Sequence, residues 1–346
     1  MADLRFGDQG LINFTPLMTL MPRVENMLER MGIFSVDFTD EDKVEFERIE
    51  IGYDEMYAVA RGADRQVAGD NQAKTAILRM PFFTLDKIIK PKDVHALRAF
   101  ATATDPETVQ SKAERVIARV QKSHARLHQK IMYQALKGST WAQDKDGNPV
   151  PNLQKTFQSM FDVADADMYN GAAGGAKSYD LTDAASNPAD EFEKVRKHVI
   201  DKAGDEGDNY EIVAVLGSDA FTALKNHPDF VEAYANYASE EEPLRRRLGG
   251  LANNRVLRWQ GVTYVEDISG EIPTDEGYFF PRGFDEMFQL MYGKSDTIDA
   301  ENGDEEISEA YLYVTTERRR QIVESEASIV AVNTRPELVA HYTFTV

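Results

Sequence analysis

Alternating apolar and polar residues in the first quarter of the chain predict a pair of strands. In VEFERIEIGY (44–53) the alternation shifts phase between Arg48 and Ile49, which is typical of a β-bulge. KTAILRMPFF (74–83) is the expected returning strand, and its apolar face is formed by Leu78, Met80 and Phe82. Residues 58–73 between them are rich in small and charged residues. Because an isolated hairpin is marginally stable in water, we expect this arm to need another surface.

The stretch from 105 to 138 has the period of a long helix. Asp105 is the expected N-cap, Pro106 suits the first turn, and Gly138 marks the end. The apolar positions fall within about 60° of one another; they are Val109, Val116, Val120, Leu127 and Ile131. Six basic residues fall within about 80° on a separate face; they are Lys112, Arg115, Arg119, Lys122, Arg126 and Lys130. Such a stripe is typical of a solvated face, and contact with an acidic partner or with phosphate is the alternative.

The second half of the chain alternates between helical and strand patterns. Residues 187–205 predict a helix with Phe192, Val195, Val199 and Ile200 at helical spacing, and YEIVAVLG (210–217) predicts a buried strand. A further helix is expected over 218–237, capped by Ser218 and broken at Pro228. Two strands around Gln260-Gly261 and two around Arg335-Pro336 complete the pattern. This half therefore predicts an α/β lobe with a terminal strand.

ILRMPFFTLDKIIKPKDV (77–94) is an apolar ribbon held between Pro81 and Pro91. Proline lacks the amide that a central strand donates, so it is found at sheet edges and turns. The ribbon therefore predicts an edge that something must cover. The segment 11–34 is also apolar and rich in methionine. Because Pro16 and Pro22 interrupt it, we expect an arm or short helix docked on protein, and no membrane span or export leader.

Composition places the chain among ordinary globular proteins of about two domains. It has 346 residues, 42% of them hydrophobic, and no cysteine, which excludes disulfides and thiolate metal sites. The formal net charge of −20 argues against a surface that grips phosphate backbones.

Candidate chemical motifs are incomplete. NGAAGGAKS (170–178) resembles the end of a phosphate-binding loop, but Ala176 stands where glycine is needed, so a flexible loop is favoured. His124 and His128 share a helical face but have no identified third metal ligand. DKDGN (144–148) and the acidic run at 299–306 lack the first ligand of a calcium loop, and Asp146-Gly147 is better interpreted as a tight turn. We therefore predict no catalytic, cofactor or metal site.

Four segments, in this order and spacing, carry a resemblance to a known family. They are LRMPFFTLDKIIKPKDV, VLGSDAFTALKNHPDFVEAY, NNRVLRWQGVTYVED and SIVAVNTRPELVAHYTF. The chain resembles the lambda-like major capsid protein E of tailed bacteriophages over most of its length. The resemblance implies an α+β chain with the Hong Kong 97-type capsid fold. It also implies a structural protein that assembles into the icosahedral head shell around a double-stranded DNA genome.

The resemblance further implies a division of the chain. Residues 1–47 would form the N-arm, 48–92 the extended E-loop, and 93–180 the P-domain with its spine helix at 105–138. Residues 181–300 would form the A-domain, and 301–346 the return of the P-domain and the terminal A-domain strand.

The implied partners are further copies of the chain, in hexamers and pentamers, together with a scaffolding protein, a portal and a decoration protein. Two sets of contacts between subunits are expected. The E-loop set is Arg61, Asp64, Arg65, Asp70, Lys74 and Phe83, and the spine-helix set is Lys112, Arg115, Arg119, Lys122 and Arg126. In the ribbon, Phe82 shares the phase of Leu78 and Met80 and is expected to pack inside its own subunit, with Phe83 facing a neighbour. The shell would belong to the virion and assemble in the host cytoplasm, with no sequence-specific DNA contact and no membrane.

Two alternatives remain at this point. A bacterial encapsulin-like shell has the same fold and encloses protein cargo instead of DNA. A soluble α/β enzyme is the other alternative, and it would need a pocket with converging polar groups.

Overall fold

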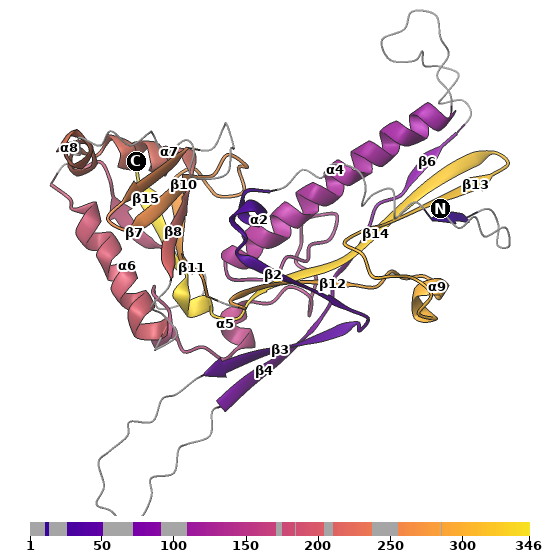
Figure 1. Ribbon diagram of the computed structural model, residues 1–346, viewed down its shortest axis with the longest axis horizontal. Helices are drawn as coiled ribbons and strands as arrows, with labels where there is room; N and C mark the ends of the chain where they lie inside the picture. Colours follow the sequence, from indigo (N-terminus) through magenta and orange to yellow (C-terminus); the bar gives the residue numbers. More distant parts are fainter. Residues whose placement is uncertain are drawn as a thin grey trace, which may run out of the picture.

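The computed structural model shows two lobes and a two-stranded hairpin beside them (Figure 1). It describes residues 11–13, 26–50, 72–90, 109–170, 175–183, 185–203, 210–236, 255–284 and 286–346. Side chains are described from residue 26 onward, except at 49–50, 72–73, 109–112 and 233–236.

The first lobe is a seven-stranded sheet built around the long strand β14 (Arg320–Asn333). One side of β14 pairs with β12 (Phe288–Gly293) and then with β13 (Tyr311–Glu317). These two behave as one interrupted strand. The other side pairs with β5 (Phe82–Thr84) and β6 (Lys87–Ile89) in one register. The edge strands β2 (Phe34–Thr39) and β1 (Leu11–Asn13) pair with β12 and β13.

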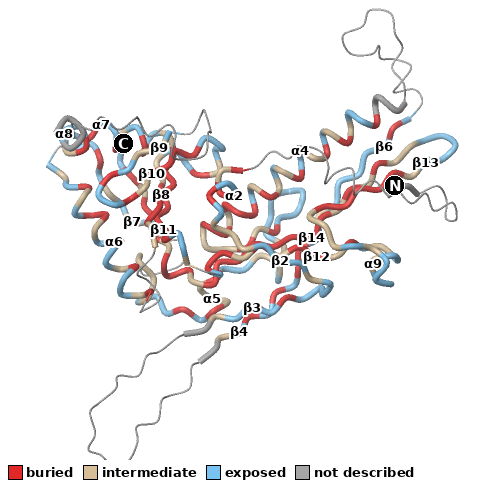
Figure 2. The backbone as a smooth tube through the Cα atoms, viewed as in Figure 1, coloured by how far each residue is buried: buried red, intermediate tan, exposed pale blue. Residues whose placement is uncertain are grey.

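The predicted long helix covers one face of this sheet. Helix α4 (Val109–Leu136) runs along β14, and Gly138 at its end has a φ of +91°. Its apolar side packs Ala113, Ile117 and Val120 against residues of β13 and β14. The buried part of β14 is red in Figure 2. The helix and its C-terminal stop were therefore predicted correctly, although residues 105–108 lie outside the described residues.

The second lobe is a six-stranded sheet in the order β7-β15-β11-β8-β10-β9. Its strands are β7 (Lys177–Asp180), β8 (Glu211–Leu216), β9 (Val256–Trp259), β10 (Val262–Glu266), β11 (Glu276–Arg282) and β15 (Ala340–Thr345). Helices α6 (Pro188–Ala203), α7 (Ser218–Asn226) and α8 (Pro228–Asn236) accompany them. The buried strand at 211–216, the break at Pro228 and the paired terminal strand agree with the sequence pattern. Gln260 and Gly261, both at positive φ, form the predicted turn.

Of the four apolar residues at helical spacing on α6, Phe192, Val195 and Val199 are buried and Ile200 is 48% exposed. The cap predicted for α7 was wrong. Ser218 is the first helical residue and not the cap, which is Gly217. The Ser218 hydroxyl instead donates to Asp219.

The hairpin consists of β3 (Lys43–Glu50) and β4 (Gln72–Arg79). Its residues pair one to one from Lys43 opposite Arg79 to Glu50 opposite Gln72, so the predicted bulge after Arg48 is absent from this ladder. Val44, Phe46, Ala76 and Leu78 form its buried face and join the main core. The hairpin is therefore anchored at its root.

Sheet membership crosses two of the expected domain boundaries. Strand β7, before residue 180, lies in the six-stranded sheet beside the terminal strand. Strand β12, before residue 300, lies in the seven-stranded sheet beside β14. The short 3-10 turn at Pro336–Leu338 connects β14 to β15 and so links the lobes.

Short elements complete the chain. They are α2 (Met27–Met31), α5 (Phe157–Met160), α9 (Ile298–Glu301) and a 3-10 turn at Asp165–Asp167. Among the described helices, none has the length and apolar character needed to cross a membrane.

Candidate functional site

The basic stripe of α4 lies on the exposed side of the helix. Arg115, Arg119, Lys122 and Arg126 are all exposed, as the sequence predicts, while the side chain of Lys112 lies outside the described residues. Within the described residues, Arg119, Lys122 and Arg126 form no ion pair. The next basic residue of the stripe is Lys130, and its Nζ lies 5.7 Å from the centre of the Trp141 ring. The stripe therefore has the exposure that a contact with another molecule requires.

The structure contradicts the role predicted for one of the two phenylalanines of the ribbon, Phe82. Phe82 pairs with Ser328 and is 41% exposed, whereas Phe83 pairs with Ala327 and stacks on Trp141 with ring centres 5.4 Å apart. The internal role expected for Phe82 is therefore wrong. The shift between β4 and β5 at Met80-Pro81 breaks the phase that Leu78 and Met80 share. A contact between Phe83 and another subunit remains a prediction, since its ring is only half-buried.

Alanine substitutions of Phe82 and Phe83 are expected to have different effects on the stability of the subunit. Phe83→Ala is expected to lower the free energy of unfolding of the unassembled subunit by about 2 kcal/mol, below the cost at a fully buried site. Phe82→Ala is expected to change it by about 1 kcal/mol or less, because the residue is 41% exposed and loses less burial. Urea titration of both variants and the parent measures this difference. Equal losses would contradict the assignment.

Most of the predicted E-loop residues cannot be placed. Arg61, Asp64, Arg65 and Asp70 lie outside the described residues. Lys74 is described, and its ammonium donates to the carbonyl of Asp162 at 3.2 Å. Lys74 thus holds the hairpin against its own subunit, and an additional contact of Lys74 with a neighbour remains a prediction.

An ion pair at the root of the hairpin was missed by the sequence analysis. Arg48 Nη2 lies 3.1 Å from Glu337 Oε1, and both side chains are largely buried. The Glu337 carbonyl also contacts His198 Nε2 of α6 at 2.9 Å. The hairpin is therefore tied directly to the connection between the lobes. The sequence could have indicated that Arg48 points inward, because it follows Val44 and Phe46 at alternate positions of the strand.

The P-loop-like segment has a structural role at the points where it is described. Lys177 forms an ion pair of 2.5 Å with Glu191, and its ammonium lies over the rings of Tyr169 and Tyr342. Burial opposes the charge of Glu191, but hydrogen bonds from Lys177 and Lys194 hold its pKa below the usual value. Residues 171–174 lie outside the described residues.

The two histidines of α4 face the sheet and not a common ligand. His124 Nε2 lies 3.2 Å from the Ser325 hydroxyl, and His128 Nδ1 lies 3.5 Å from the Tyr292 hydroxyl. No group of three potential metal-ligating side chains occurs in the described part of the chain. Burial lowers the pKa of His124 to about 4.

Stability is therefore expected to depend on pH through His124. Between pH 6.5 and 4 the unfolded chain binds a proton at His124 that the folded chain does not bind. The contribution of neutral His124 to the free energy of unfolding is therefore fully present above pH 6.5 and decreases as the pH falls to 4. The loss is about 3 kcal/mol for this group. His124→Gln is expected to remove this contribution in urea titrations at several pH values. An unchanged pH slope in the variant would contradict it.

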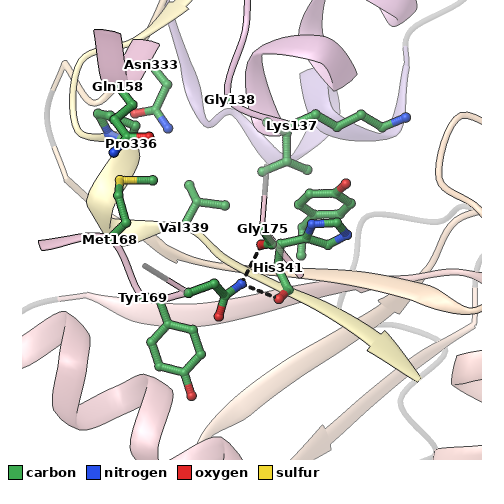
Figure 3. Close-up of a pocket in the computed structure, with 13 residues that line it drawn as sticks. Lys137, Gly138, Gln158, Met168, Tyr169, Gly175, Asn333, Pro336, Val339 and His341 are labelled. Carbon is green, nitrogen blue, oxygen red and sulfur yellow. Dashed lines mark hydrogen bonds between the residues drawn. The ribbon is translucent and has the colours of Figure 1, made fainter. Parts of the chain in front are cut away.

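A cleft lies where the two lobes meet (Figure 3). Asn170 Nδ2 donates to the carbonyls of Gly175 at 2.7 Å and His341 at 2.6 Å, while Asn170 Oδ1 and Asn333 Nδ2 are buried without a hydrogen-bond partner among the described residues. Lys137 donates to the Glu271 carbonyl, and His341 stacks on Tyr278 with ring centres 4.3 Å apart. The Lys137 contact joins the end of α4 to the segment before β11, and the other contacts lie beside the six-stranded sheet.

Comparison with known proteins decides the family. The model of the family described as phage major capsid protein E matches residues 13–344. The chain belongs to this family. Its function is accordingly that of a structural capsid protein, and its place is in the capsid of the virion. The major capsid protein of Pseudomonas phage KPP10 is 27% identical to this member of the family, over 94% of each chain.

Solved capsids confirm the fold. The mature capsid protein of bacteriophage PhiM1 aligns with a TM-score of 0.54 at 14% identity, over 94% of this chain and 89% of the other. The capsid protein of cyanophage Pam1 aligns with a TM-score of 0.54 at 13% identity, over 93% and 94%. The α+β Hong Kong 97-type fold expected for a major capsid protein E is therefore correct.

Proposed function

We propose that this capsid protein assembles by itself into hexamers and pentamers that close into an icosahedral shell around double-stranded DNA. The observation that carries the proposal is the β3–β4 hairpin, a separate two-stranded sheet with one face buried in the core and the other face, including Ile77, exposed. An arm of this kind gains stability from a neighbour. The −20 net charge suits an inner wall that does not bind packaged DNA.

The expected domain division becomes part of this proposal. Residues 1–47 would act as the N-arm, 48–92 as the E-loop, 93–180 as the P-domain, 181–300 as the A-domain, and 301–346 as the return and the terminal strand. The exposure of Arg119, Lys122 and Arg126 supports the spine helix as a contact surface. The proposal includes a purely structural role, without enzymatic activity, and membership of the capsid family supports it.

The proposed partners are further copies of this chain, a scaffolding protein, a portal and a decoration protein, and assembly would take place in the host cytoplasm. Light scattering and negative-stain electron microscopy of the purified protein test self-assembly, with closed isometric shells as the expected result. A protein that stays monomeric, both alone and with its scaffold, would refute the proposal. Nuclease-protected double-stranded DNA in shells from infected cells distinguishes a phage head from an encapsulin-like shell filled with protein.

A further inference from the structure

One lateral edge of the seven-stranded lobe is acidic and apolar. We define the acidic flank as the exposed residues of β2, the turn after it, and the outer face of β3. Its carboxylates are Asp37, Asp40, Glu41, Asp42, Glu45 and Glu47. Val36 is 48% exposed and Phe38 is 52% exposed beside them. The basic residues close to this flank are Lys43, Arg79 and Lys294, and the ammonium of Lys294 is already bonded to Glu301.

Another lateral edge of the same lobe is basic and apolar. We define the basic flank as the α4 stripe together with the edge strands β5 and β6. The stripe contributes Arg115, Arg119, Lys122 and Arg126, and β6 contributes Lys87. Phe82, Leu85 and Ile88 are between 41% and 43% exposed on this flank. Asp86 and Glu114 are its exposed acidic residues.

The two flanks lie on opposite sides of the lobe. In the sheet, β2 is the outermost strand on the side of β14 that carries β12, while β5 and β6 lie on the other side. The basic stripe of α4 lies on the same side of the lobe as β5, because Lys130 of the stripe contacts Trp141, which stacks on Phe83 of β5. The other side of α4 contacts α2 through Asn26 and β12 through Tyr292.

The apolar residues argue that both flanks are covered in the assembled protein. Eleven large apolar side chains are exposed among the described residues, and five of them lie on the two flanks. A sixth, Ile77, is 61% exposed on the outer face of the hairpin, directly opposite Glu45. Exposed apolar residues gathered among charges are typical of association surfaces.

We infer that the acidic flank of one copy of this chain docks on the basic flank of the next. This inference rests on the proposed function and names the surfaces that join neighbouring subunits within a ring. The occupant is a second copy, because each flank finds its complement in charge and apolar character on the same chain. A contact between two different surfaces is head to tail, and it closes into a ring when the rotation between copies permits.

The dimensions of the two flanks also agree. From Arg115 to Arg126 the helix rises by about 17 Å. From Asp42 to Glu47 the extended chain covers about 17 Å. Several charges of each row can therefore meet in one docked arrangement, with the apolar residues of the two flanks between them.

Charge reversal on each flank tests the inference. Arg119→Glu with Arg126→Glu reverses the basic flank, and Glu45→Lys with Glu47→Lys reverses the acidic flank. Each pair of substitutions alone is expected to abolish shell formation in light scattering, since like charges then face each other. The matched control is Lys197→Glu with Lys225→Glu, two exposed positions on the other lobe, and it is expected to assemble like the parent.

The chain that carries both reversals provides the deciding measurement. Its flanks are again complementary, so it is expected to recover shells, which a mere folding defect in the single-flank variants would not allow. Mixing the two single-flank variants is also expected to restore association, with the two variants alternating. The inference is overturned if single-flank variants assemble normally, or if the doubly reversed chain folds but does not assemble. If the parent chain itself forms no shells, the proposed function fails instead.

Discussion

Removal of residues 58–71 is expected to give a folded subunit that forms no shells. The deletion leaves β3 and β4 whole, and their buried face, with Val44, Phe46 and Leu78, keeps its place in the core. The melting temperature of the unassembled subunit should therefore change little. Assembly should be lost completely, because the deletion removes most of the proposed contact residues of the E-loop. Light scattering and negative-stain microscopy measure assembly, and thermal melting measures the fold.

A glycine-serine segment of equal length in place of residues 58–71 serves as the matched control. It preserves the span of the arm and removes its side chains, including Arg61, Asp64, Arg65 and Asp70. Failure of both variants would indicate that the side chains are needed, while rescue by the linker would indicate that connection alone suffices. Normal shells from the deletion variant would contradict the assignment of this segment to the E-loop.

Replacement of Gly217 by alanine is expected to be among the most destabilising single changes in the second lobe. A Cβ at this position would lie 2.1 Å from the carbonyl oxygen of Pro273 and 2.6 Å from the carbonyl carbon of Thr274. Both are backbone atoms, so no flexible side chain can move aside. The Gly217 amide also donates to the carbonyl of Glu276 at 2.8 Å. Separation of these segments should cost about 3–4 kcal/mol.

Gly303→Ala is the matched control for Gly217→Ala. Gly303 has a φ of +75°, and a Cβ there would meet no atom within 4 Å. Its replacement should therefore cost only the left-handed backbone strain of about 1 kcal/mol. Urea titration of the two unassembled variants compares the losses. Similar losses would show that the close approach at Gly217 relaxes easily.

Features specified by neighbouring residues were predictable from the sequence. The strand at 211–216, the turn at Gln260-Gly261 and the stop of α4 at Gly138 depend on apolar runs and glycine conformation. The basic stripe follows from helical spacing alone. The resemblance to the capsid family rested on the order of such segments, and the match to residues 13–344 confirmed it.

Features that depend on pairing across the chain were not predictable. The exposure of Phe82 follows from the register against β14, about 245 residues later in the chain. The Arg48–Glu337 pair joins residues that lie 289 positions apart. The acidic flank likewise combines β2, a turn and β3, and only the fold shows that it lies across the lobe from the basic stripe.

The interruption between β12 and β13 has a consequence for how this chain can vary. Gly293 and Tyr311 face Ser328 and Glu326, only two residues apart on β14, so the chain leaves and re-enters the sheet within about 7 Å. The Tyr311 hydroxyl closes this neck by donating to the Gly293 carbonyl at 3.0 Å. The length of residues 294–310 is thus independent of the strand register. In evolutionary terms this is a place where insertions can accumulate, and in engineering terms it is a place to display a foreign peptide.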